Sequence, residues 1–89
     1  MERMNFDLAE LQAFVAVAER QSFRAAAEAL HLSQPALSRR IDKLEAALGT
    51  ALLARTTRRV ALTATGRDFL APARLALGSL QEAVLRLAD

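Results

Sequence analysis

The side chains suited to recognition chemistry are concentrated between Ser33 and Ile41. On a helical wheel of roughly 100° per residue, the apolar positions of this segment and its continuation share one narrow face: Leu37, Ile41, Leu44 and Leu48. The opposite face carries Pro35, Arg39, Asp42, Lys43 and Ala46, with Ser38 at its edge. Arginine can hydrogen-bond guanine edges, and serine can hydrogen-bond other base edges or phosphate. This small, polar and basic face is what a helix needs in order to lie in a DNA major groove.

A helix over these residues has a clear start and a clear end. Ser33 is a candidate N-cap, and Pro35 is tolerated in the first turn because the amides there have no intrahelical acceptor. Gly49 can end the helix in the left-handed conformation. Gln34 falls outside the outer face of the wheel, but it sits in the first turn, where the end of the helix protrudes.

Two preceding helices are expected to position this one. Asp7 and Glu10 have the spacing of a capping box and predict a first helix over about residues 7–20, with apolar residues at Leu8, Leu11, Phe14, Val15, Val17 and Ala18. Ser22 caps a short second helix, whose apolar residues are Phe23, Ala26, Ala27 and Leu30. A three-residue link joins the second and third helices, which is the helix-turn-helix pattern.

The rest of the chain predicts a hairpin and one long helix. Residues 52–55 and 59–62 are short extended candidates around Thr56-Thr57-Arg58. Thr63 or Thr65 then caps a final helix that runs to about Ala88. We therefore expect a mainly α fold in which residues 1–62 form one domain and residues 63–89 form an appended helix.

Composition excludes several classes of protein. The 89 residues suffice for one small domain but leave no room for a ligand-enclosing α/β enzyme domain. The chain has no cysteine, which removes disulfides, thiolate zinc sites and cysteine nucleophiles. Acidic residues near the N-terminus argue against a signal peptide, and no segment approaches the roughly 20 apolar residues of a membrane span. We expect a soluble, cytoplasmic protein without a membrane partner.

Basic residues are concentrated in the middle of the chain. The net charge is only +2, but residues 39–67 contain seven basic residues against two acidic ones, whereas residues 1–38 contain three basic and five acidic. Such a stripe can neutralise phosphates, or it can be an ordinary solvated face. Arg24, Lys43 and Arg59 are accordingly either phosphate contacts or plain surface, and Ser33 could act as a helix cap alone.

Catalytic chemistry is not indicated. The serines have no plausible His-Asp arrangement, and the chain has no phosphate-cradling glycine loop. His31 lies in the expected turn without a second His or Cys to complete a metal site. We expect no enzymatic activity, no metal and no cofactor. The remaining alternative to a DNA reader is a protein-interaction module, a small helical dimer whose basic stripe docks an acidic partner and treats all duplexes alike.

Several motifs at fixed spacing together resemble the N-terminal domain of LysR-type transcriptional regulators. The matching segments are 22–27, 30–41, Leu44-Glu45, Leu48-Gly49, 52–55 and 62–66. The resemblance implies a winged helix-turn-helix, with a three-helix core and a hairpin wing, that binds double-stranded promoter DNA as a dimer. It also implies a bacterial, nucleoid-associated protein whose long linker helix leads to an effector-sensing domain, with RNA polymerase as a partner of the intact regulator. A chain of this size cannot hold that sensing domain, so we interpret it as the DNA-binding domain with its linker helix.

The resemblance also assigns residues. By position, Gln34, Pro35, Ser38 and Arg39 are similar to the major-groove contacts of the family. Arg55 and Arg58 match its wing, where Arg58 would enter the minor groove. The candidate DNA-binding set is completed by Arg24, Ser33, Lys43 and Arg59. Arg40 points partly inward on the wheel and is expected to form an ion pair or to extend its charge along the surface. The chain departs from the common pattern at Leu53 and Ala54, where many members carry Phe and Glu.

The final helix carries an apolar seam with alternating spacings of three and four, formed by Leu70, Ala73, Leu77, Leu80, Val84 and Leu87. Fewer than three heptads is short for a coiled coil, so an ordinary core-facing helix is the alternative. We predict that this seam is the interface of a homodimer. Its two recognition helices would then meet successive major grooves about 34 Å or a multiple apart, on an interrupted inverted repeat.

Overall fold

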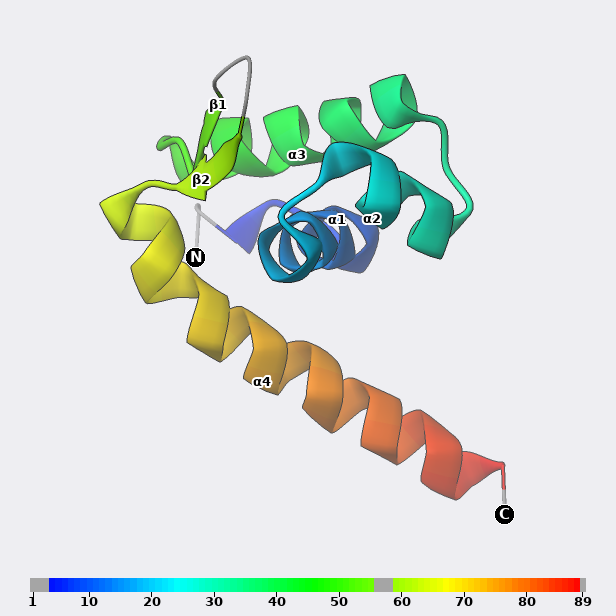
Figure 1. Cartoon of the computed structure of the whole chain (residues 1–89). Coiled ribbons are helices and arrows are strands. Elements are labelled where there is room, and N and C mark those ends of the chain that lie inside the picture. The colour runs from blue at the N-terminus through cyan, green and yellow to red at the C-terminus, as the bar shows by residue number, and fades with distance from the viewer. Residues whose placement is uncertain (1–3, 56–58, 89) are drawn as a thin grey trace.

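The computed structural model describes residues 4–55 and 59–88, and in this part of the chain it contains four α-helices and one antiparallel pair of strands (Figure 1). In chain order the elements are α1 Leu8–Arg20, α2 Phe23–Leu30, α3 Gln34–Leu48, β1 Leu53–Arg55, β2 Val60–Leu62 and α4 Ala64–Leu87. Helices α1 to α3 and the hairpin form one body, and α4 leaves it as a long arm (Figure 1). The mainly α fold expected from the sequence is confirmed.

Local hydrogen bonds fix where the first three helices begin. The Asp7 carboxylate accepts from the Glu10 amide at 2.8 Å, and the Glu10 carboxylate accepts from the Asp7 amide at 3.4 Å, which confirms the capping box. The hydroxyl oxygens of Ser22 and Ser33 each accept from the amide three residues on, at 3.0 and 3.2 Å. These caps satisfy amides that have no intrahelical acceptor.

Left-handed residues end the same three helices. Gln21 closes α1 with φ 54°, His31 closes α2 with φ 57°, and Gly49 closes α3 with φ 73°. Gly49 is the expected C-cap, and His31 occupies the tight turn of the helix-turn-helix, as the sequence predicts. This backbone conformation lets α3 depart sharply from α2.

The core lies between α1 and the helices around it. α1 contacts α2, α3 and α4, and its Phe14 and Val17 are fully buried. The ring of Phe14 lies 5.8 Å from that of Phe69 on α4. Ala26 and Ala27 of α2 are also buried, and their small side chains let α2 approach α1 closely.

The hairpin is shorter than expected. β1 and β2 pair in the register Leu53 with Leu62, Ala54 with Ala61 and Arg55 with Val60, so each strand has three residues instead of four. Leu52, predicted to be in the first strand, instead precedes it as a fully buried residue. Residues 56–58, including Arg58, lie outside the described part of the chain.

The start of α4 packs directly on the backbone that precedes β1. Thr63, not Thr65, caps the helix, and its hydroxyl accepts from the Gly66 amide at 3.0 Å while donating to the Ala51 carbonyl at 2.7 Å. The Thr63 amide donates to the Leu52 carbonyl at 3.0 Å. A Cβ on Gly66 would overlap with that same carbonyl oxygen, so only glycine permits this approach.

The first half of α4 is fixed against α1. Ala73 and Leu77 are buried in the core, and Arg74 Nε lies 2.7 Å from a carboxylate oxygen of Glu19 on α1. The helix continues through Pro72 to Leu87, and its second half extends beyond the body (Figure 1). The direction of the arm is therefore set by contacts made in its first half.

Candidate nucleic-acid interface

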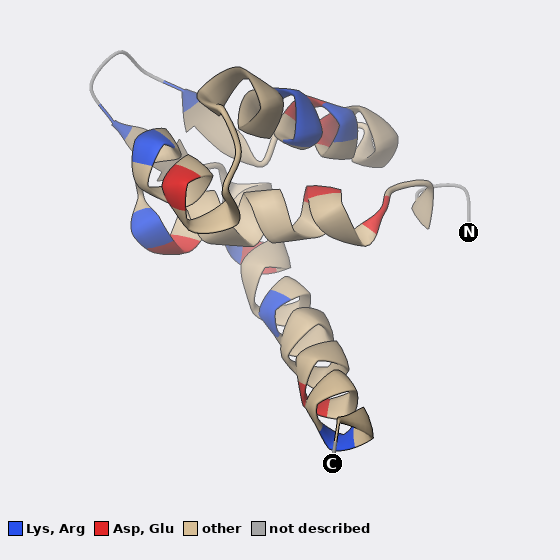
Figure 2. Ribbon diagram, turned by 90° about the vertical axis from the view of Figure 1, so that its right-hand side faces the viewer, with Lys and Arg blue, Asp and Glu red and all other residues tan. Residues whose placement is uncertain are grey.

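Helix α3 presents the outer face that the wheel predicts. Leu37, Ile41 and Leu44 are fully buried on its inner side. On the other side Pro35, Arg39, Asp42, Lys43 and Ala46 are exposed, and Ser38 is half-buried at their edge. Gln34, which the wheel left off this face, is exposed in the first turn. Most of the Lys and Arg positions lie in the part of the molecule formed by α2, α3 and the hairpin, whereas the arm of α4 carries few (Figure 2).

Three basic side chains of α3 lie near the start of α1. Arg39, Arg40 and Lys43 line a shallow depression together with Asp7 and Glu10. Arg40 is half-buried there, in keeping with its expected partly inward direction, while Arg39 and Lys43 are exposed. Arg39 and Lys43 therefore remain accessible to a ligand on the outer side of the helix.

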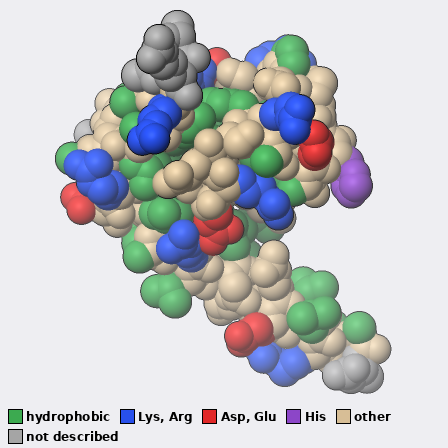
Figure 3. Space-filling view, in the orientation of Figure 1, with side chains coloured by type: hydrophobic (Ala, Val, Ile, Leu, Met, Phe, Trp, Pro, Cys, Tyr) green, Lys and Arg blue, Asp and Glu red, His purple; other side chains and the backbone are tan. Residues whose placement is uncertain are grey.

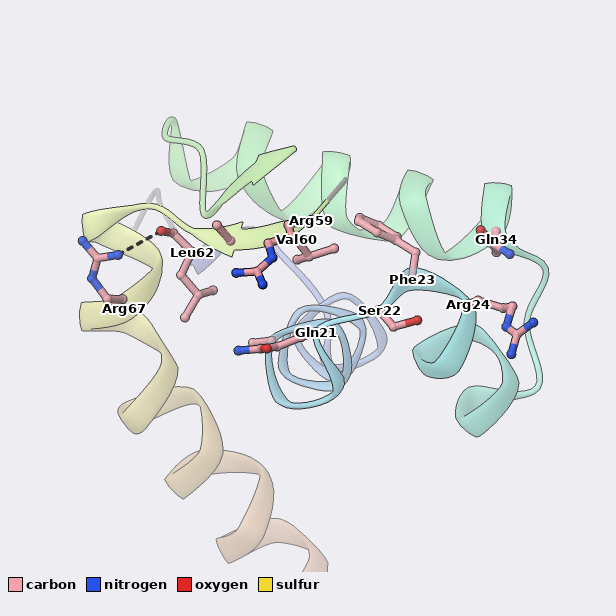
Figure 4. A pocket seen from close by; sticks show the side chains of 11 residues that line it. Gln21, Ser22, Phe23, Arg24, Gln34, Arg59, Val60, Leu62 and Arg67 are labelled. Atoms are coloured by element: carbon pink, nitrogen blue, oxygen red, sulfur yellow. Dashed lines mark hydrogen bonds between the residues drawn. The ribbon is translucent and has the colours of Figure 1, made fainter. Parts of the chain in front are cut away.

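A second group of basic residues surrounds an open hollow of about 780 Å³ between α2, α3 and the hairpin. Arg24 of α2, Gln34 of α3 and Arg59 beside β2 line this hollow, although they lie far apart in the sequence (Figure 4). Arg67, at the start of α4, lines the far end and donates to the Leu62 carbonyl at 3.1 Å (Figure 4). Basic side chains are spaced around this partly apolar surface (Figure 3). A surface with cations from several elements can contact a curved chain of phosphates.

Arg55 turns from the hairpin back to α3. Its Nη1 donates to Ser38 Oγ at 3.2 Å, and its Nη2 donates to Asp42 Oδ1 at 2.9 Å and lies 3.9 Å from Glu45 Oε1. The guanidinium lies 5.4 Å from the centre of the Phe23 ring. Two residues assigned separately to DNA contact by resemblance, Arg55 and Ser38, are thus bonded to each other.

Glu45 has a positioning role that sequence reasoning did not identify. Its Oε2 accepts from the amides of Leu52 and Leu53 at 2.7 and 3.1 Å, which ties the start of the hairpin to α3. Its presence in the resemblance motif Leu44-Glu45 was the one available signal. The two partners lie seven and eight residues away, Leu52 just before β1 and Leu53 as its first residue.

The predicted dimer seam is divided by the fold. Ala73 and Leu77 are 3% and 7% exposed, and Leu70 packs against the core. The first half of the seam is therefore part of an ordinary core-facing helix, which was the alternative to a dimer interface. Leu80, Val84 and Leu87 are 48%, 62% and 84% exposed. An apolar groove runs between α1 and this second half, lined by Leu8, Gln12, Leu77, Leu80, Gln81, Val84 and Leu85. Leu8, expected on the buried face of the first helix, is 46% exposed and borders this groove.

Within residues 4–55 and 59–88, no helix is long and apolar enough to cross a bilayer. The same residues contain no group of three or more His, Cys, Asp or Glu side chains placed to hold a metal ion.

A three-helix core, a helix-turn-helix pair with a basic outer face, and a hairpin beside it define a winged helix-turn-helix, a class of DNA-binding fold. Residues 8–67 match the family described as bacterial regulatory helix-turn-helix proteins of the lysR family. The chain belongs to this family. It is the DNA-binding domain of a bacterial transcriptional regulator, in a family of regulators and not of enzymes.

Curated relatives extend the comparison over the whole chain. The sequence is 50% identical over 90 residues to the transcriptional regulator PtxR of Pseudomonas aeruginosa, covering 100% of this chain and 29% of that protein. It is 49% identical over 83 residues to the regulator YnfL of Escherichia coli, covering 93% of this chain and 28% of that protein. The chain therefore spans less than a third of the length of these relatives.

Solved structures include DNA complexes of similar domains. The complex of BenM_DBD with catB site 1 DNA has a TM-score of 0.86 and 41% identity, with coverage of 94% of this chain and 98% of that one. The CbnR_DBD–DNA complex has a TM-score of 0.84 and 41% identity, with coverage of 93% and 95%.

Proposed function

We propose that this domain binds specific double-stranded promoter DNA as a homodimer, with α3 in the major groove and the hairpin at the minor groove. The observation that carries the proposal is the outer face of α3, where Arg39 and Lys43 are exposed beside small and polar residues. The inner face of the same helix is anchored in the core by the fully buried Leu37, Ile41 and Leu44. A rigid helix with such a face can approach base edges without disturbing the core. Similar domains have been solved in complex with DNA, which supports the same assignment.

The proposed contacts divide by chemistry. Pro35 and Ser38 are small enough to let α3 come close to the bases, and Arg39 and Gln34 supply longer side chains that can hydrogen-bond base edges. Phosphate contacts are assigned to three basic residues, Arg24, Lys43 and Arg59, because they are exposed on α2, α3 and the hairpin. The Ser33 hydroxyl accepts from the Ala36 amide, which leaves its own O–H available to donate to a phosphate.

The minor-groove assignment belongs to the hairpin. β1 and β2 lie beside α3, so a duplex centred on α3 would pass next to the hairpin (Figure 1). Arg58, between the two strands in sequence, is the residue proposed to enter the minor groove, where arginine favours narrow A·T-rich segments.

The homodimer is proposed to form through the second half of α4. Leu80, Val84, Leu85 and Leu87 are exposed, and in the described part of α4 Leu77 is the last residue that is buried in the core. Such a row of large apolar side chains is costly to leave in water and favours a partner helix. In this proposal residues 1–62 read DNA and residues 63–89 join two copies, on an inverted repeat whose half-sites lie about 34 Å or a multiple apart.

The longer relatives extend the proposal to the intact regulator. Because this chain spans only 28% and 29% of YnfL and PtxR, we propose that α4 leads to an effector-sensing domain and that the intact protein contacts RNA polymerase. A cytoplasmic, nucleoid-associated location belongs to the same proposal.

Arg39→Ala tests base reading directly. We expect it to weaken binding to the preferred duplex by about 1 to 3 kcal/mol and to relax preference at one base position, with little change on random DNA. Titration of both duplexes by fluorescence anisotropy measures this difference. Arg86→Ala is the matched control, because Arg86 is an exposed arginine at the far end of α4, within 4.0 Å of Glu82. Equal losses on specific and random DNA for Arg39→Ala would refute base reading.

A further inference from the structure

We propose that Arg55 is a positioning residue of the DNA interface and not itself a DNA contact: it cancels the charge of Asp42 and holds Ser38 as a hydrogen-bond donor. The proposal rests on the proposed function above, and it reassigns a residue that the family resemblance places among the DNA contacts. It also makes Ser38 a residue whose base preference is set by a second side chain.

The Arg55 side chain contacts several other residues at once. Its two terminal nitrogens donate to Ser38 and Asp42 at 3.2 and 2.9 Å, and its guanidinium lies over the ring of Phe23. The partners come from α2 and α3, whereas Arg55 itself ends β1. A fork-shaped guanidinium that bonds two groups at once and stacks on a ring is well fixed in orientation.

The charge of Asp42 explains why such a cation is needed. Asp42 lies on the exposed side of α3 with its side chain 59% accessible, among the residues proposed to face DNA. An uncompensated carboxylate there would repel phosphates and oppose the attraction of Arg39 and Lys43. The Arg55 guanidinium already pairs with this carboxylate in the free protein, so no cation from solution has to neutralise it when the phosphates approach.

The bond to Ser38 selects the role of its hydroxyl. A serine hydroxyl has one O–H donor and two acceptor lone pairs, and the Arg55 N–H already occupies one lone pair. A cationic donor on the oxygen also polarises the O–H bond and makes it a better donor. Ser38 is therefore set to donate to an acceptor such as purine N7, guanine O6 or thymine O4, in preference to accepting from the cytosine N4 amine.

Glu45 connects this arrangement to the hairpin. One of its carboxylate oxygens lies 3.9 Å from Arg55 Nη2, and the other accepts from the Leu52 and Leu53 amides. The two ends of β1 are thus held to α3, one through Glu45 and the other through Arg55. Placement of the hairpin and presentation of Ser38 depend on the same group of side chains.

A double-mutant cycle between Arg55 and Asp42 tests the charge argument. The probes are the duplex recovered by selection from random sequences and a scrambled duplex of the same composition. Arg55→Gln is expected to weaken specific binding about 10-fold, whereas Asp42→Asn alone is expected to bind about as the wild type does, because the charge that it removes is already cancelled by Arg55. The double variant has the wild-type net charge and is expected to return to within about threefold of wild type. The proposal would be overturned if the double variant bound as weakly as Arg55→Gln and if the slope of log affinity against log salt concentration became smaller in magnitude by about 0.9. That change in slope is expected for the loss of one phosphate contact.

Base preference gives a readout that a purely structural role would not change. Ser38→Ala and Arg55→Gln are expected to relax preference at the same base position, and Arg55→Lys is expected to retain affinity but to lose that preference, because lysine lacks the fork that reaches both partners. Unchanged preference in both Arg55 variants would contradict the assignment. Thermal melting identifies any variant that fails to fold. If Arg55→Gln fails to fold, Arg55→Lys still provides the test.

The wild type separates failure of this proposal from failure of the proposed function. If the wild type itself binds both probes equally, the proposed function fails. If it discriminates between the probes but the cycle shows no coupling, the Arg55 proposal alone fails.

Discussion

Gly66→Ala is expected to lower the free energy of unfolding by about 3 kcal/mol, a large fraction of the stability of a domain of this size. The added Cβ would overlap with the Leu52 carbonyl oxygen, which also accepts the Thr63 amide. The obstructing atom belongs to the backbone, so it cannot rotate away as a flexible side chain would. The start of α4 must then separate from the segment before β1. Urea unfolding followed by circular dichroism measures the change.

Gly78→Ala is the matched control for this prediction. Gly78 lies in the same helix, and a Cβ there would meet nothing within 4 Å. Alanine has the higher helix propensity, so this variant is expected to gain about 0.5 to 1 kcal/mol of stability. If Gly66→Ala were as stable as Gly78→Ala, the close approach of α4 to residue 52 would be contradicted.

Leu80→Asp is expected to abolish the dimer and to weaken binding to a duplex with two half-sites by about 100-fold, because each half-site is then bound independently. Leu80 is half-exposed in a single copy, so the folded monomer is expected to keep nearly its full thermal stability. Burying one carboxylate from each copy in an apolar interface would cost far more than the contact contributes. Analytical ultracentrifugation reports the dimer, and anisotropy titration reports the affinity.

Leu75→Asp controls for the added charge. Leu75 is more exposed than Leu80 and lies about 140° away from it around the helix, outside the apolar groove between α1 and α4. This variant is expected to remain dimeric. A wild-type chain that sediments as a monomer at high concentration would remove the basis of the prediction, and a dimeric Leu80→Asp variant would place the interface elsewhere.

The elements that the sequence predicts best are those fixed by local chemistry. The caps at Asp7, Ser22, Ser33 and Gly49 act over three or four residues, so their residue types alone locate the helix ends. The buried face of α3 follows from helical periodicity in the same way. The sequence could not decide between Thr63 and Thr65 as the cap of α4, because that choice depends on the carbonyl of Ala51, which only the tertiary fold brings near Thr63.

The division of the α4 seam shows the limit of a periodic pattern. A spacing of three and four predicts which side of a helix is apolar, but the same spacing serves an intramolecular core and a dimer interface. The fold buries Ala73 and Leu77 against α1 because Gly66 and Arg74 direct α4 along that helix. It leaves Leu80 and Val84 exposed beside Leu8, at the start of α1.

The role of Arg55 could not be predicted from the sequence either, because it also depends on the tertiary fold. Its partners Ser38 and Asp42 lie 17 and 13 residues away, and their side chains meet only because the hairpin folds back over α3. Resemblance assigned Arg55 by its position in the wing, and position carries no information about where a long side chain turns. The net charge of the outer face of α3 therefore has to include Arg55 of the hairpin as well as the charged residues of the helix.

Selection of bound sequences from a pool of random duplexes tests sequence-specific binding by the dimer most directly. We predict an enriched motif made of two inverted half-sites whose centres lie about 10 base pairs or a multiple apart, with a preferred base at the position read by Arg39. Recovery of duplexes without any enriched motif, at an affinity equal to that for the starting pool, would contradict DNA reading and favour a basic surface that docks an acidic protein.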